Sequence, residues 1–266
     1  MDRIRIARET LKVLEKGEYI AANEVVKLPM DSYKEVIVIT PSVGEELLSK
    51  DMESASNQMC NIVITTEDSL EAGIRYEDVL VMNFANAHKA GGGFLGGARA
   101  QEEEICRRST LYASIASDKA KEMYRYNNSH LSSVESDYML ISPNVYVWRD
   151  VGTYEPRCAP KKVGVVTVPA PNRRGAAMLA SKELIVDTFE RRIRIMLKAA
   201  IGYGYKNLVL GAWGCGAFGN DPTMVANCFK KVIIEEGLGF FFDEICFAIY
   251  GSEDGRNITA WREVMT

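Results

Sequence analysis

A glycine-rich segment at residues 83–104, NFANAHKAGGGFLGGARAQEEE, separates an apolar run from an acidic helix. The run before it, residues 79–82 (VLVM), is typical of a buried strand. Residues 98–117 after it contain good helix formers, with Ile105 and Ile115 among the apolar residues at roughly helical spacing. A strand, a glycine loop and a helix in this order expose free backbone N–H groups that can bind a phosphate. A phosphate site beside carboxylates indicates chemistry on a phosphorylated sugar.

A second glycine-rich loop, residues 211–221 (GAWGCGAFGND), follows the apolar run at 207–210. It leads into a predicted helix in which Asp221 is a natural N-cap and Pro222 suits the first turn. Both loops leave the carboxyl ends of predicted strands, where open α/β folds bind their ligands. We therefore expect the two loops to face one diphosphate. The alternative is that the glycines serve only tight turns and close packing.

Both loops also match the spacing GxGxxG of dinucleotide-binding folds, which is a weak signal by itself. The matching residues are Gly91, Gly93, Gly96, Gly214, Gly216 and Gly219. That fold requires an acidic residue roughly 20 positions on, at the end of the next strand. Asp118 has nearly this spacing but lies at the end of a predicted helix. The glycines are therefore interpreted as a different type of phosphate loop.

The first loop resembles the signature of the poly(ADP-ribose) glycohydrolase family in its compact microbial form: three glycines, then seven residues, then Gln101-Glu102-Glu103. The resemblance covers most of the chain through RRS at 107–109, LY at 111–112, ISP at 141–143, PAPN at 169–172 and the second glycine loop. It implies a macrodomain-like fold. It also implies hydrolysis of ribose–ribose O-glycosidic bonds in poly(ADP-ribose), with release of ADP-ribose and without a metal or other cofactor.

The three consecutive glutamates differ in their predicted roles. Successive helical residues diverge by about 100°, so Glu102, Glu103 and Glu104 cannot all face one cleft. Most glycosidases place two carboxylates on opposite sides of the bond, whereas adjacent helix residues lie on one side. This favours one carboxyl group that first protonates the leaving ribose oxygen and then activates water. The resemblance implies that Glu103 has this catalytic role, that Glu102 holds the ribose hydroxyls, and that Glu104 is solvated.

The predicted substrate-binding residues lie in the two loops and beside them: Asn83, Gly91, Gly92, Gly93, Gln101, Gly214, Cys215, Gly216, Ala217, Phe218 and Gly219. The Asn83 amide could bind ribose hydroxyls or orient Glu103. Phe218 could stack on a ribose or base, or it could pack beneath its loop. Asn86 matches the family pattern less clearly, and Asn172 could either shape the cleft or hold a turn.

The cysteines do not indicate metal binding or catalysis. Six of them are scattered without metal-ligand spacing, so we expect reduced thiols. Thiol catalysis by Cys215 would need a base, and the only two histidines, His88 and His130, lie in no recognisable partner motif. An inert Cys215 thiol is therefore favoured over a thiol hydrolase.

Composition limits the possible partners. The net charge is −4, and the paired arginines form no basic stripe, which disfavours direct nucleic-acid binding. No apolar run approaches the roughly 20 residues of a membrane helix, and the charged N-terminus is not a secretory signal. We expect a cytoplasmic monomer that acts on poly(ADP-ribose) or ADP-ribosylated proteins. The alternatives are a non-catalytic ADP-ribose-binding macrodomain or a hydrolase of other ADP-ribose derivatives.

Predicted strands alternate with predicted helices, which favours one three-layer α/β/α domain over residues 1–266 with a mixed central sheet. The predicted strands are residues 35–40, 61–65, 80–83, 138–141, 145–148, 163–168, 207–210 and 241–250. The predicted helices include an N-terminal extension over about residues 1–30, residues 181–200 with Ser181 as N-cap, and residues 222–236. Residues 118–136 and 149–162 are the least regular and are expected to cover the site.

Overall fold

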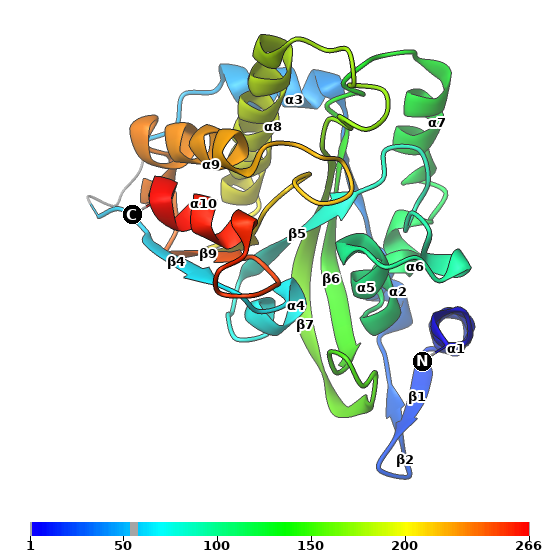
Figure 1. Cartoon of the computed structure of the whole chain (residues 1–266). Coiled ribbons are helices and arrows are strands. Elements are labelled where there is room, and N and C mark those ends of the chain that lie inside the picture. Colours follow the sequence, from blue (N-terminus) through cyan, green and yellow to red (C-terminus); the bar gives the residue numbers. More distant parts are fainter. Residues whose placement is uncertain (1, 54–57, 266) are drawn as a thin grey trace.

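The computed structural model describes residues 2–53 and 58–265, and its central sheet has seven strands in the order β3-β6-β7-β5-β8-β9-β4 (Figure 1). These strands are β3 (Ile37–Ile39), β4 (Asn61–Thr65), β5 (Val79–Ala85), β6 (Met139–Arg149), β7 (Pro156–Pro169), β8 (Asn207–Leu210) and β9 (Glu244–Ala248). β6 is antiparallel to both of its neighbours, β3 and β7, whereas the order from β7 to β4 is parallel throughout. The mixed sheet predicted from the sequence is confirmed.

The central strand β5 is apolar on both faces, which requires a helical layer on each side. Leu80 and Met82 belong to one core cluster, and Val79 and Val81 to another, because successive strand residues point to opposite faces. The first face is covered by α3 (Pro41–Ser49), α8 (Lys182–Gly202), α9 (Pro222–Lys230) and α10 (Arg256–Met265). The second is covered by α4 (Ser69–Gly73), α5 (Gln101–Arg108), α6 (Leu111–Ile115) and α7 (Lys121–Ser129). This is the expected three-layer, macrodomain-like arrangement.

The N-terminal extension is helical only in its first half. α1 (Arg3–Lys16) ends at Gly17, whose φ of 71° lies in the left-handed region that glycine tolerates. A hairpin of β1 (Glu18–Ala21) and β2 (Glu24–Lys27) follows, and the short α2 (Met30–Tyr33) comes after it. The expected helix over residues 1–30 therefore needs correction. The alternation of buried Tyr19 and Ala21 is the period-two signal that the helical interpretation overlooked.

Several element ends agree with their sequence signals. The strands at 61–65 and 207–210 have the predicted bounds. Ser181 caps α8 by accepting a hydrogen bond from Leu184 N at 3.1 Å. Asp221 caps α9 in the same way, with Met224 N at 2.9 Å from Asp221 Oδ1. Helix caps depend on residues close in sequence, so tertiary packing does not change them.

Other predictions were wrong where packing changed the local preference. The strands predicted at 138–141 and 145–148 form one strand, β6, with an irregularity in its pairing. The helix predicted over 98–117 breaks after Arg108, because Ser109 is extended and its hydroxyl donates to Ile105 O at 2.7 Å. About half of residues 118–136 and 149–162 lie in regular elements, α7 and the start of β7. No helix within residues 2–53 and 58–265 is long and apolar enough to cross a membrane.

Candidate active site

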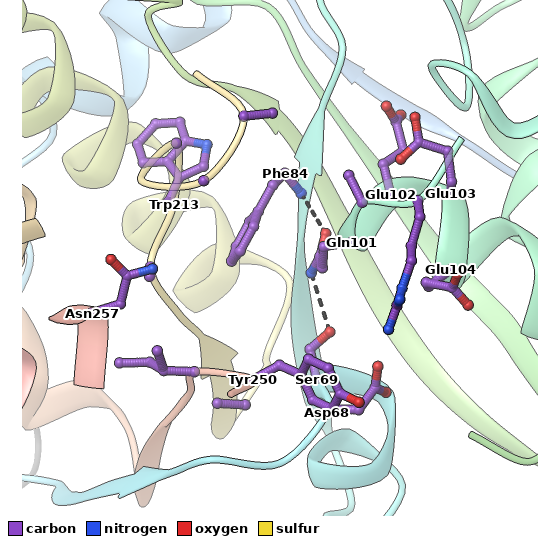
Figure 2. Close-up of a pocket in the computed structure, with 18 of the residues that line it drawn as sticks. Asp68, Ser69, Phe84, Gln101, Glu102, Glu103, Glu104, Trp213, Tyr250 and Asn257 are labelled. Atoms are coloured by element: carbon purple, nitrogen blue, oxygen red, sulfur yellow. Dashed lines mark hydrogen bonds between the residues drawn. The ribbon is translucent and has the colours of Figure 1, made fainter. Parts of the chain in front are cut away.

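A cavity of about 770 Å³ opens where the parallel strands end and the start of α5 meets them (Figure 2). Its walls come from the N-terminus, the start of α5, the second glycine loop and other segments near the strand ends. The wall residues are Arg3, Asp68, Ser69, Phe84, Asn86, residues 99–104, Val151, Gly152, Tyr154, Ala170, residues 212–214 and 216–218, residues 248–250 and Asn257. The carboxyl ends of parallel strands are where open α/β folds bind ligands, as the sequence analysis expected.

Gln101 fixes the start of α5 to the sheet. Its Oε1 accepts a hydrogen bond from Phe84 N at 2.8 Å, and its Nε2 donates to Met82 O at 2.6 Å and to Ser69 Oγ at 3.1 Å (Figure 2). The preceding residue, Ala100, provides no side-chain cap for this helix. Gln101 lines the cavity as predicted, but these contacts give it the role of holding the next two residues in place.

Glu102 is buried and hydrogen-bonded on both oxygens. Its Oε1 accepts from Asn83 Nδ2 at 3.4 Å, and its Oε2 accepts from Asn86 N at 2.8 Å. Burial raises the pKa of this carboxyl group to about 8 and outweighs the opposing hydrogen bonds from Asn86 and Asn83. Glu102 is therefore mostly protonated at neutral pH, and it can donate a hydrogen bond as well as accept one.

Glu103 lies beside Glu102 on the same side of the helix start (Figure 2). Its Oε1 accepts a hydrogen bond from Gly93 N at 2.8 Å. Its Oε2 is buried, and no group in the described part of the chain donates to it. Glu103 is one of the residues that line the cavity, and a carboxyl oxygen without a protein partner keeps its capacity to carry a proton or to accept a hydrogen bond.

The first glycine loop surrounds the glutamates and does not line the cavity. A Cβ on Gly91 would touch the ring of Tyr112, and one on Gly92 would overlap the Glu103 carboxyl group. The Gly93 N–H is already bonded to Glu103. Gly91, Gly92 and Gly93 therefore pack closely around the glutamates and hold Glu103, while the expectation that both loops face one diphosphate stays a prediction.

Glu104 is not solvated as expected. It points away from Glu102 and Glu103 (Figure 2) and forms ion pairs with Arg107 Nη1 at 3.0 Å and Arg3 Nε at 3.9 Å. The Tyr154 hydroxyl also donates to it. The cause is tertiary: α1 and the β6–β7 turn cover this side of α5.

The second glycine loop does form part of the cavity wall. Gly214, Gly216, Ala217 and the half-buried Phe218 line it, and Phe218 also packs against the core. Gly214 has a φ of +74°, and a Cβ there would lie 2.7 Å from Ala170 Cβ. This loop remains the candidate for the diphosphate and for a ring that contacts the sugar.

Cys215 and Gly219 belong to this loop but do not line the cavity. The Cys215 thiol donates to Trp213 O at 3.6 Å, and burial raises its pKa to about 12. His88 and His130 are exposed and do not line the cavity either. The thiol is therefore protonated at neutral pH, and an inert cysteine stays the favoured interpretation.

The three asparagines considered in the sequence analysis each form hydrogen bonds within the protein. Asn83 is fully buried, and its Nδ2 donates to Glu102 Oε1 and to Thr167 Oγ1, so it orients Glu102 rather than Glu103. Asn86 Oδ1 closes a turn by accepting from His88 N at 2.9 Å. Asn172 Oδ1 does the same with Arg174 N at 3.1 Å.

Val151, Gly152 and Tyr154 belong to residues 149–162, which were expected to cover the site. Other wall residues were not predicted: Arg3, Asp68, Ser69, Phe84, Tyr250 and Asn257. Phe84 and Tyr250 lie at the carboxyl ends of β5 and β9, so the strand-end rule could have identified them. Arg3 comes from α1, and no local motif places it. Within the described ranges, no group of three or more His, Cys, Asp or Glu side chains is arranged to hold a metal ion.

The fold and the site together define a macrodomain-like protein with a buried pair of carboxyl groups at the start of a helix. Residues 7–150, more than half of the chain, match the family of the microbial-type poly(ADP-ribose) glycohydrolase (PARG) catalytic domain. No curated protein matches the chain significantly.

Solved bacterial structures agree with this match. The poly(ADP-ribose) glycohydrolase of Thermomonospora curvata is 34% identical, covers 98% of both chains and has a TM-score of 0.92. The same enzyme bound to the inhibitor ADP-HPD has a TM-score of 0.88 at the same identity and coverage. The Deinococcus radiodurans enzyme in complex with ADP-ribose is 33% identical over 90% of this chain and 98% of its own, with a TM-score of 0.81. The chain therefore belongs to the microbial-type poly(ADP-ribose) glycohydrolase family.

Proposed function

We propose that this glycosidase cleaves the ribose–ribose O-glycosidic bond of poly(ADP-ribose) with Glu103 as a single general acid and base. The observation that carries the proposal is the buried Glu103 Oε2, which has no partner in the described part of the chain while Oε1 is held by Gly93 N. One fixed oxygen orients the carboxyl group, and the other is left for the substrate.

In the first step, protonated Glu103 gives its proton to the leaving ribose oxygen as the bond to the anomeric carbon breaks. The resulting oxocarbenium ion is stabilised by the nearby diphosphate. In the second step, the Glu103 carboxylate removes a proton from a water molecule that attacks the same carbon. Adjacent Glu102 binds the ribose hydroxyls, and its raised pKa of about 8 lets it donate or accept there.

We further propose that one terminal ADP-ribose unit occupies the cavity, with its diphosphate on the loop from Gly214 to Phe218. The cavity volume of about 770 Å³ is within the range of sites for ligands of this size. The two relatives bound to ADP-HPD and ADP-ribose support this choice. The backbone N–H groups of a glycine loop can bind a diphosphate without formal positive charge.

The test is release of free ADP-ribose from automodified polymerase in the presence of EDTA. A glycohydrolase that needs no metal releases ADP-ribose at the same rate with and without the chelator. Glu15→Gln is the control for Glu103→Gln in this assay, because Glu15 is exposed on α1 and does not line the cavity. If the protein bound ADP-ribose tightly but released none, it would instead be a binding module. Release that required added metal would overturn the metal-independent mechanism.

A further inference from the structure

Arg107 is a fully buried cation on the helix that carries the glutamates, one turn after Glu103. Burying a guanidinium is costly, and here the two terminal nitrogens have acceptors, whereas Nε has none in the described part of the chain. Its Nη2 donates to Ala98 O and, at 3.5 Å, to Phe94 O, while its Nη1 donates to Glu104 Oε1 at 3.0 Å. The guanidinium also lies 5.9 Å from the centre of the Phe94 ring. Most of these acceptors belong to the end of the first glycine loop.

That end of the loop is bonded directly to the residue that holds Glu103. Ala98 N donates to Gly93 O at 3.2 Å, and Gly93 N donates to Glu103 Oε1 at 2.8 Å. A Cβ on Gly93 would lie 2.5 Å from Ala98 Cβ, so the two residues are packed as tightly as glycine allows. A closed circuit therefore runs from Glu103 through Gly93 and Ala98 to Arg107, and it starts and ends on α5.

The backbone carbonyl group of Arg107 is also held by hydrogen bonds. Its carbonyl oxygen accepts from Thr10 Oγ1 and from Arg149 Nη1, each at 3.1 Å. The last carbonyls of a helix have no partner within it, and α1 and β6 supply one here. Arg107 consequently cannot rotate or translate without breaking bonds to three separate segments.

From this circuit we infer that Arg107 is a positioning residue, which sets the Glu103 carboxyl group by holding Ala98 and Gly93 in place. The inference rests on the proposed role of Glu103. Only an arginine has the forked donors that reach two carbonyls and a carboxylate together. Lysine retains the charge but presents a single nitrogen, so it cannot hold the loop and Glu104 at the same time.

The experiment compares Arg107→Lys with the matched control Arg194→Lys. Arg194 is also ion-paired, to Glu190 and Glu236, but lies on α8 outside the cavity wall. Arg107→Lys is expected to lower kcat by about 10-fold to 100-fold, as a displaced catalytic group does. The KM for polymer and the Kd for ADP-ribose, measured by calorimetry, should stay close to wild type. Arg194→Lys should leave all three unchanged.

A double-mutant cycle separates positioning from general destabilisation. If Arg107 acts through Glu103, adding Arg107→Lys to Glu103→Gln causes little further loss of the residual rate. The inference would be overturned if the losses in the double mutant were fully additive. It would also be overturned if Arg107→Lys left kcat unchanged, or if this variant lost as much ADP-ribose affinity as kcat. A wild-type rate for Glu103→Gln itself would instead overturn the proposed function.

Two further variants complete the test. Glu104→Gln removes one ion pair of Arg107 but leaves its bonds to the loop, so it should lower kcat much less than Arg107→Lys; an equal loss would show that Arg107 acts through Glu104 and would overturn the inference. If Arg107→Lys does not fold, Thr10→Val loosens the backbone of Arg107 by removing the hydroxyl that donates to Arg107 O. Thr10→Val should lower kcat by a smaller factor than the one expected for Arg107→Lys, at constant KM. An unchanged kcat would count against the inference.

Discussion

A Cβ atom on Gly92 would lie 2.6 Å from Glu103 Oε1 and 3.2 Å from Glu102 Oε2. The Gly92 backbone also has a φ of +54°, in the left-handed region that disfavours other residues. The loop therefore approaches both carboxyl groups as closely as a backbone can, and its shape and the positions of the glutamates depend on each other.

Gly92→Ala is expected to displace the Glu103 carboxyl group and lower kcat by roughly 10²-fold, because misplacement of a catalytic group by about 1 Å has effects of that size. Gly202→Ala is the matched control, since a Cβ at Gly202 meets nothing within 4 Å, its φ is not positive, and the residue does not line the cavity. Steady-state kinetics on polymer would compare the two. Similar rates for both variants would contradict the close packing described for Gly92.

The three glutamates should respond differently to replacement by glutamine. Glu103→Gln keeps the size of the side chain but removes its titrating proton, so turnover should fall by roughly 10²–10⁴-fold while ADP-ribose affinity changes little. Glu102→Gln should reduce both turnover and affinity, because it alters the group that binds the ribose hydroxyls. Glu104→Gln keeps an acceptor for Arg107 and Tyr154 and should have a small effect. An inactive Glu104→Gln beside an active Glu103→Gln would refute the assignment.

Glu102→Gln should also remove a pH dependence of stability. The Glu102 carboxyl has a pKa of about 8 in the folded protein, against 4.5 as its ordinary value. Between these values the folded state binds more protons than the unfolded state, so the free energy of unfolding falls as the pH rises from about 5 to about 8. The Tm of the wild type should therefore fall relative to that of Glu102→Gln over this range. Thermal denaturation at several pH values would check this, and a constant difference would contradict it.

Cys215→Ser should retain most of the turnover. The thiol has a pKa raised to about 12 by burial, and the backbone carbonyl of Trp213 accepts its hydrogen bond. Serine can make the same bond, so we expect kcat and KM within about threefold of wild type, a difference of less than 1 kcal/mol. Rates measured before and after thiol alkylation would provide a second check. Loss of turnover in Cys215→Ser would revive the thiol-hydrolase alternative.

Sequence patterns predicted the central fold well because its strands are apolar on both faces and its helices begin at strong caps. Two strands have the predicted bounds, residues 61–65 and 207–210. Two helices begin at the predicted caps, Ser181 and Asp221. These features are encoded by residues that are close together in the sequence. The hairpin at β1 and β2 was missed because it follows a good helix directly, and the short period-two alternation at Tyr19 and Ala21 was overlooked.

The candidate site was predicted in its composition but not in its internal contacts. The motif predicted that Glu102 and Glu103 belong to the site together with the second loop, and all of them contribute to the cavity wall. It could not show that the first loop holds the glutamates, because the Gly93–Glu103 bond depends on how the loop folds back onto α5. It also could not place Arg3, which reaches the site only through the docking of α1.

The junction of Thr10, Arg107 and Arg149 has a consequence for biosynthesis. Thr10 and Arg149 lie 139 positions apart in the chain, yet both bond at the end of α5. Contacts at such separation require closure of a long loop and form slowly relative to local structure. On the ribosome, the helix with the glutamates is made well before β6 can emerge to secure it. A nascent chain therefore contains Glu102 and Glu103 for some time before the contacts that fix the end of α5 can form.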